Sequence, residues 1–345
     1  NIRAVTEEST GAWVQLDFAG EIGNVGVRGD VGIRYVETTT TSTGLVSGEP
    51  VTVDRDYDNM LPSLNLAFEL TDEFMIRTSI ADVMSRPTLG DLTPGGSLDS
   101  FNGPPYPYNA GNPGLDPYEA TNFDVSFEWY FADDALLSFT WFDKDVSSFF
   151  QSSESVIVPY SQSGLPLDLP PASSPLEVAL SAGEDPEVEI SQTANGGDAS
   201  VNGFEIIYQQ PFAFLPGNWA NLGFTGNFTR AESDEIVGFS ENAYNATLYY
   251  EDETFSARVS AAYRDPYQTR FPNSSGREER GYDSTMNVDL AMAYRLNDSM
   301  DLTLEVLNLT DEYENQLFDV ADLVYVHHHT GTEFILGFRW SPASN

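Results

Sequence analysis

The chain has 345 residues, 41% of them hydrophobic and 13% aromatic, so its composition supplies a folded core or a lipid-facing surface and excludes a disordered protein. Its formal charge of -39, from 54 Asp and Glu against 15 Lys and Arg, would repel nucleic acid and excludes DNA and RNA as partners. The absence of Cys excludes disulfides and thiolate chemistry, and no apolar run is long enough for a transmembrane helix.

The first predicted strands are residues 12–18 and 25–36, joined by a short connector at 20–24. In the second strand Val27, Val31 and Ile33 alternate with charged residues, which is the period of a β-strand with one apolar and one polar face. Residues 1–10 have the composition of a loop. The Thr-rich and Gly-rich residues 38–50 predict a long polar connector.

Short and long connectors then alternate along the chain. Further short ones are predicted at 71–73, 132–134, 211–218, 251–253 and 297–298, an intermediate one at 232–240, and long ones at 86–118, 151–199, 265–281 and 310–329. Outer-membrane barrels have short periplasmic turns and long extracellular loops, so this alternation predicts the topology. The Pro-rich residues 86–118 and 165–186 predict extended, partly mobile surface loops.

Residues 282–309 show the repeating unit most clearly. Val288, Leu290 and Met292 lie on one face of a predicted strand, a turn follows at 297–298, and the alternation resumes after it. Strands of about ten residues cross a bilayer when they are tilted. A soluble sandwich would have the same period, but aromatic residues at the strand ends favour a membrane.

About thirteen strands are predicted in this way. The last one spans residues 333–340, with Phe334, Leu336, Phe338 and Trp340 toward lipid. Single-chain bacterial barrels have an even number of strands. Either one strand is miscounted or further strands precede this chain. The predicted fold class is therefore all-β, a transmembrane antiparallel β-barrel.

Charged residues recur on the polar face of the predicted strands, where they would line the lumen of a barrel. They are Arg77, Asp124, Glu128, Arg258, Asp289, Arg295 and Glu305. Opposite charges on neighbouring strands can neutralise one another, and the same residues could contact a plug inside the barrel.

The long loops contain aromatic and basic residues that could bind a ligand. The candidates are Tyr106, Tyr108, Tyr118, Tyr160, Arg264, Tyr267, Arg270 and Phe271. Aromatic rings can stack on sugar rings, and Arg can hold an anionic group. The alternatives are that the aromatic side chains pack within their own loops around Pro, and that the Arg side chains pair with nearby carboxylates.

Two groups could bind a divalent cation loosely, and no other cofactor is expected. Asp54, Asp56 and Asp58 lie on one face of an extended segment, and His327 and His329 share a face. A solvated acidic rim and a polar loop are the alternatives. No GxSxG, HExxH or P-loop sequence is present, so an enzyme is not expected.

Several segments of the chain resemble one family when they are taken together. They are LPSLNLAFELTDEFMIRTSIADVMSRP (61–87), GNPGLDPYEATNFDVSFEWYF (111–131), FDKDV (142–146), VNGFEIIYQQPFAFLPGNWANLGFTGNFT (201–229), YNATLYYEDETFSARVSAAYR (244–264) and NLTDEY (308–313). In this order and spacing they resemble the carboxyl-terminal barrel of TonB-dependent outer-membrane receptors, in particular a subgroup abundant in Caulobacter-like bacteria. The resemblance implies a barrel of about 22 strands. Residues 1–345 would form its carboxyl-terminal part, and the plug domain and first strands would lie outside this chain.

The resemblance also implies a function and a location. Such a receptor lies in the outer membrane of a Gram-negative bacterium, among lipid and lipopolysaccharide, and imports a scarce ligand to the periplasm. The TonB complex supplies energy through the plug, and a surface lipoprotein could cap the barrel. An oligosaccharide ligand is expected ahead of a ferric siderophore. The alternatives are a surface structural or adhesive barrel and a passive porin.

Overall fold

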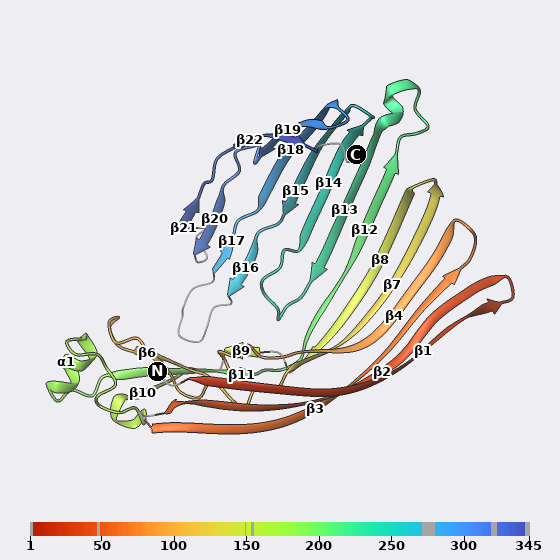
Figure 1. Cartoon of the computed structure of the whole chain (residues 1–345). Coiled ribbons are helices and arrows are strands. Elements are labelled where there is room, and N and C mark those ends of the chain that lie inside the picture. The colour runs from red at the N-terminus through yellow and green to blue at the C-terminus, as the bar shows by residue number, and fades with distance from the viewer. Residues whose placement is uncertain are drawn as a thin grey trace.

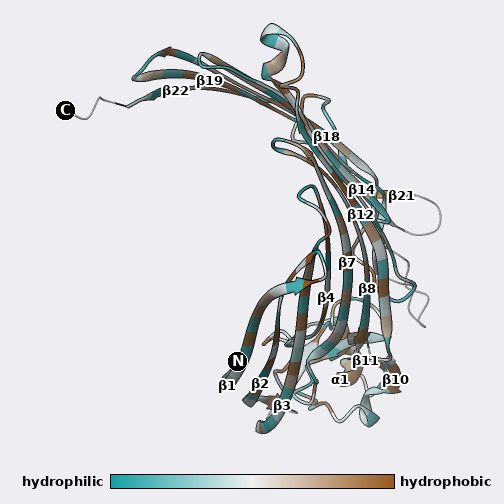
Figure 2. Cartoon of the chain, turned by 90° about the vertical axis from the view of Figure 1, so that its right-hand side faces the viewer, coloured by the Kyte–Doolittle hydropathy of each residue, from teal (hydrophilic) through white to brown (hydrophobic). Residues whose placement is uncertain are grey.

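The computed structural model describes residues 3–46, 49–148, 150–152, 155–270, 280–318 and 323–341. Thirteen strands form one antiparallel sheet that curves into an open arch (Figures 1 and 2). Across the sheet they are β1 (Ala4–Ile22), β2 (Val25–Val46), β3 (Glu49–Glu69), β4 (Phe74–Ser85), β7 (Tyr118–Ala132), β8 (Ala135–Ser147), β12 (Ala199–Pro211), β13 (Leu222–Glu232), β14 (Asn242–Glu251), β15 (Phe255–Arg264), β18 (Thr285–Asn297), β19 (Met300–Leu307) and β22 (Glu333–Trp340). Among the described residues, no helix is long and apolar enough to cross a membrane.

The sheet has a short-turn end and a loop end. At the short-turn end β1 and β2 are joined through Gly23, whose φ of 66° suits a tight hairpin, and the turn before β13 contains the 3-10 helix η2 (Gly217–Asn221). The hairpin of β18 and β19 pairs Arg295 with Asp301 and Asn297 with Met300. The predicted strand number and the bounds of the last strand are confirmed.

One face of the sheet carries a row of aromatic rings that continues from strand to strand. The ring centroids of Phe123 and Trp141 are 5.9 Å apart, and Phe204 lies 5.8 Å from Phe139 and 5.9 Å from Phe228. We call this the aromatic face and the opposite one the polar face. Side chains alternate along every strand, so the two faces follow directly from the sequence period.

Two sequence predictions at the start of the chain are wrong. β1 begins at Ala4, inside the segment predicted to be a loop, and β2 and β3 continue through most of residues 38–50. Thr is β-branched and fits a strand. Its alternate positions also lie against another part of the chain, because Thr38, Thr40 and Ser42 are buried.

The cover over these residues is a folded unit built from two long loops, which we call the loop module (the described residues of 86–117 and 148–198). It contains β5 (Gly96–Leu98), β6 (Tyr106–Ala110), β9 (Phe150–Ser152), β10 (Val156–Pro159), β11 (Glu187–Asn195), the 3-10 helix η1 (Tyr160–Gln162) and α1 (Pro175–Ser181) (Figure 1). β6 pairs with β11 in parallel although about 80 residues separate them. The module meets β2 closely, since a Cβ at Gly44 would overlap the Pro94 carbonyl oxygen.

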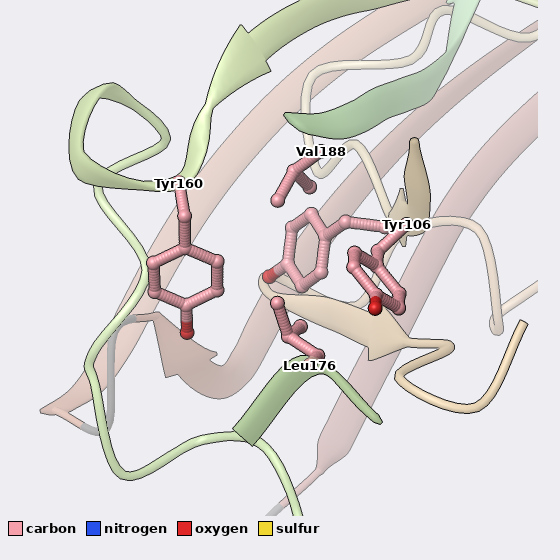
Figure 3. Close-up of a cluster of buried hydrophobic side chains, with 5 residues drawn as sticks. Tyr106, Tyr160, Leu176 and Val188 are labelled. Atoms are coloured by element: carbon pink, nitrogen blue, oxygen red, sulfur yellow. The ribbon is translucent and has the colours of Figure 1, made fainter. Parts of the chain in front are cut away.

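The loop module has a core of its own, so the prediction that these loops are extended is wrong. Tyr106, Tyr108, Tyr160, Leu176 and Val188 are buried together (Figure 3). Helix α1 begins where Ser174 accepts a hydrogen bond from the backbone N–H of Glu177 and where Pro175 occupies the first turn. The Pro and Tyr residues of these loops are therefore part of a packed unit.

A second sheet of loop strands lies beyond β15, β18, β19 and β22. It is formed by β16 (Tyr267–Arg270), β17 (Arg280–Tyr282), β20 (Glu314–Phe318) and β21 (Leu323–His328). The long connectors 265–281 and 310–329 therefore also pair with each other.

Neighbouring residues of β12 provide a test of the two faces. Ile206 pairs with Phe139 and Phe228 on the aromatic face, and Ile207 pairs with Ser138 and Asn227 on the polar face. If the aromatic face contacts lipid, Ile206→Arg should destabilise the protein by about 2–4 kcal/mol, because a charge would enter hydrocarbon. Ile207→Arg should cost much less. Urea unfolding in lipid vesicles measures both, and equal losses would contradict the assignment.

The core of the loop module provides a second test. Burial raises the pKa of Tyr160 to about 12, with Asp168 adding to the effect, and the hydroxyl donates a hydrogen bond to the Pro166 carbonyl at 2.7 Å. The fold favours the neutral phenol, so its contribution to stability is complete below pH 10.0 and is lost as the pH rises through 12. The difference between tyrosinate absorbance titrations of the native protein and Tyr160→Phe should therefore show one tyrosine ionising near pH 12. A component at the ordinary pKa would show that this ring is solvated.

Candidate ligand-binding site

The predicted lumen charges lie on the polar face and several are paired. Arg77 Nε lies 2.8 Å from Glu128 Oε1, and Ser79 donates a hydrogen bond to Asp124 Oδ2 at 3.1 Å. Because the Arg77 side chain is 45% exposed, this ion pair contributes less than about 1 kcal/mol to stability. Its main effect is to neutralise charge on the face.

The remaining charges of this set share the same face across β15, β18 and β19. Arg258 on β15 and Glu305 on β19 are the cross-strand neighbours of Ala291 on β18. Asp289 accepts a hydrogen bond from the Asn308 N–H at 2.8 Å. Arg295 Nε lies 3.8 Å from Asp301 Oδ1. The register thus gathers these residues on one surface. That this surface lines a barrel lumen remains a prediction.

Polar contacts attach the loop module to the upper ends of β1 and β3. Arg86 Nη1 lies 3.0 Å from Glu7 Oε1, and Arg55 forms an ion pair with Asp116. Burial raises the pKa of Tyr57, opposed chiefly by a hydrogen bond with Thr38. These contacts fix the module against the sheet.

The aromatic loop candidates divide into buried and accessible residues. Tyr106, Tyr108 and Tyr160 are 3%, 8% and 1% exposed and belong to the module core. They present no ring face to a ligand, so the prediction that they bind one does not fit the structure. Their packing against Pro-rich loops is the physical reason. Tyr118 is half-buried at the start of β7.

The metal candidates do not form a coordination site within the described residues. No group of three or more His, Asp or Glu side chains there is arranged to hold a metal ion. Asp54, Asp56 and Asp58 are exposed along β3. The Tyr313 ring stacks with His327 and His329, whose ring nitrogens bond to Asn315 and Asp311. The imidazoles are therefore engaged in local contacts.

A cavity of about 580 Å³ lies on the polar face at the loop end of β8, β12, β13, β14, β15 and β18. Polar and aromatic side chains line it, and the segment before β14 adds one wall. The lining residues are Phe142, Lys144, Val201, Thr229, Ala231, Gly238, Phe239, Ser240, Ala243, Asn245, Ala262, Tyr263, Arg264, Thr285 and Asn287. This volume is typical of a small-ligand site.

Local contacts position the Arg264 side chain at this cavity. Its guanidinium carbon lies 3.9 Å from the centre of the Tyr267 ring, and its Nε donates to the Ser240 hydroxyl at 3.1 Å. The Gly238 N–H donates to the Gln268 carbonyl at 2.8 Å, which anchors the segment between β13 and β14 (residues 233–241). Arg264 and Tyr267, two of the predicted binding residues, are thus brought together.

The carboxylate next to Arg264 is engaged elsewhere. Asp265 accepts hydrogen bonds from the Asn242 side chain at 2.6 Å and from the Tyr263 hydroxyl at 2.8 Å. The Asn242 side chain, supported by the Tyr263 hydroxyl and by the Asn242 N–H, holds the pKa of Asp265 below its usual range. Asp265 therefore remains ionised and is satisfied by partners other than Arg264.

Several cavity residues were missed by the sequence analysis, notably Lys144, Phe239 and Asn245. Lys144 is the one lysine of the chain and lies between Asp143 and Asp145 on β8, so its being the single lysine was the available signal. Phe239 carried no signal, because its place depends on how the segment before β14 folds. The Arg270 side chain and Phe271 lie outside the described residues.

The comparisons with known proteins agree with this architecture. A model of the TonB dependent receptor-like β-barrel matches residues 1–309. No curated protein matches the chain.

Solved structures share the fold at low sequence identity. The ferric enterobactin receptor PfeA from Pseudomonas aeruginosa matches 97% of this chain and 54% of its own length, with a TM-score of 0.59 at 17% identity. The siderophore receptor PirA from Acinetobacter baumannii matches 97% and 55%, with a TM-score of 0.59 at 14% identity. The ferric-catecholate import receptor Fiu from E. coli matches 97% and 45%, with a TM-score of 0.62 at 15% identity.

The chain thus spans about half the length of these structures. The family model covers most of its residues, and the thirteen-stranded sheet has the faces and the alternation of turns and loops of an outer-membrane barrel. The chain therefore belongs to the TonB-dependent receptors, the β-barrel transport proteins of the Gram-negative outer membrane.

Proposed function

We propose that this chain is the carboxyl-terminal part of the barrel of a receptor that binds an oligosaccharide at its extracellular end and imports it to the periplasm. A plug domain and further barrel strands would complete the receptor, and the TonB complex would move the plug. Lipid and lipopolysaccharide would surround the aromatic face. The barrel part supplies the wall and the specificity of the binding site.

The cavity beside β8, β13 and β15 is the observation that carries this proposal. Its lining combines the ring of Phe142 with the Asn245 and Asn287 amides and with the hydroxyls of Thr229 and Thr285. Amides and hydroxyls hydrogen-bond sugar hydroxyl groups, and aromatic rings stack on the apolar face of a sugar ring. Outer-membrane barrels have their short turns in the periplasm, and this rule supports an outward-facing position for a cavity at the loop end.

A ferric siderophore is the alternative ligand. The PfeA and Fiu structures are described as receptors for ferric enterobactin and for ferric catecholates, and they share the fold of this chain at 17% and 15% identity. A likeness at this identity shows a shared architecture and does not identify the ligand. Specificity lies in the loops and in the cavity lining, which differ most between related proteins.

Uptake by cells tests the proposal. A strain that carries the full-length receptor should accumulate labelled oligosaccharide, and deletion of the TonB gene should abolish the accumulation because no energy reaches the plug. Asn245→Leu should reduce uptake at limiting substrate by about tenfold, since it removes a hydrogen bond to a sugar hydroxyl and leaves an unpaired group.

Asn221→Leu, at the opposite end of the barrel, serves as the matched control and should leave uptake unchanged. Accumulation that survives loss of TonB would indicate a porin. Accumulation of ferric enterobactin in place of sugar would establish the siderophore alternative.

A further inference from the structure

We infer that the cavity takes an acidic oligosaccharide, a saccharide chain that carries carboxylates, and that Lys144 and Arg264 bind its negative charges. This inference rests on the proposed function and names the substrate class of the same site. Both side chains line the cavity. They come from β8 and β15, which three strands of the sheet separate.

The charge of the cavity lining is opposite to that of the chain. The chain has 54 Asp and Glu residues against 15 Lys and Arg, yet among the described residues the cavity is lined by Lys144 and Arg264 and by no carboxylate. A random sample of the surface would be acidic. Two cations without a lining carboxylate create a local positive potential that favours an anionic ligand.

Both cations are available to a ligand. Neither Lys144 nor Arg264 takes part in an ion pair within the described part of the chain. Lys144 Nζ lies 5.7 Å from the centre of the Phe142 ring, and Arg264 uses Nε for Ser240. The terminal guanidinium nitrogens can therefore hold a carboxylate through two parallel hydrogen bonds.

Arg230 lies in the same region but, unlike Lys144 and Arg264, it forms ion pairs within the chain. Its guanidinium lies 2.5 Å from Glu232 and 2.6 Å from Glu241, so its charge is neutralised by the chain itself. Glu232 and Glu241 line a separate pocket together with Asp234. Ala231 and Phe239 line both pockets, so an acidic pocket adjoins the cationic cavity.

The distance between the two cations favours an extended ligand. Four strand spacings of about 4.8 Å separate β8 from β15, so the Cα atoms of Lys144 and Arg264 are on the order of 20 Å apart. A compact ferric siderophore concentrates its charge around one metal and would contact one of them. An oligosaccharide with a carboxylate on successive sugars can reach both, while its hydroxyls meet Asn245, Asn287 and Thr285.

The test is direct binding to the full-length receptor in detergent, measured by calorimetry. Tetragalacturonate and an alginate tetramer are compared with their carboxyl-reduced, neutral counterparts, so that each pair differs only in charge. We expect the acidic form of at least one pair to bind about tenfold or more tightly, and Lys144→Met or Arg264→Met to remove this preference. Arg258→Met removes a cation from the same face of the same strand, six positions nearer the short turns, and should retain it.

The outcomes separate the inference from the proposed function. Equal affinity for the acidic and neutral tetramers, or a preference that survives both substitutions, would overturn the inference and leave an oligosaccharide receptor in place. Tight binding of ferric enterobactin that depends on Lys144 and Arg264, with no tetramer bound, would overturn both. A heat-modifiable band on gel electrophoresis confirms that each variant has folded as a barrel.

Discussion

A strand inside a bilayer cannot leave backbone N–H and C=O groups unpaired, and the construction of this sheet follows from that requirement. Among the described residues, antiparallel ladders pair each inner strand on both sides over at least part of its length, whereas β1 and β22 are each paired on one side. Strand direction alternates across thirteen strands, so β1 and β22 run the same way. Direct closure would make a parallel pair. Antiparallel closure takes an odd number of further strands, which is consistent with a chain that spans about half of the related structures.

The alternation of side chains along each strand separates apolar from polar residues. Because successive side chains point to opposite faces, most aromatic residues of the strands lie on one surface and most of the paired charges lie on the other. Trp141 and Lys144 illustrate this, since residues three positions apart on β8 lie on opposite faces. The polar face can then hold ion pairs such as Arg77 with Glu128 without exposing them to hydrocarbon.

Local sequence was sufficient for the features that depend on a strand period or on a single turn. The last strand, Glu333–Trp340, was predicted, and the hairpin turn was predicted at 297–298, one residue before its observed position at 298–299. Alternation and turn residues are encoded within about ten positions, so such features can be found locally. The loop module could not be predicted. Its parallel pairing of β6 with β11 and the burial of Tyr106 and Tyr160 depend on contacts between two separate loops.

The cavity was predicted in part for a related reason. Arg264 and Tyr267 are close in sequence and were recognised as candidates, and they stack. Lys144 lines the same cavity as Arg264 because of the register of four successive strand pairs from β8 to β15. That register cannot be deduced from local sequence. A one-residue shift in any pair would move a side chain to the other face.

An acidic surface around a cationic cavity raises the question of how an anionic ligand could approach it. The answer lies in the range of the forces. At physiological ionic strength the Debye length is about 8 Å, so the repulsion from the outer carboxylates is screened beyond that distance. Contacts inside the cavity are screened much less, because Arg264 is half-buried between Tyr267 and Ser240. The outer charge therefore slows the approach of an anion at low salt, whereas Lys144 and Arg264 set how long it stays once it is in contact.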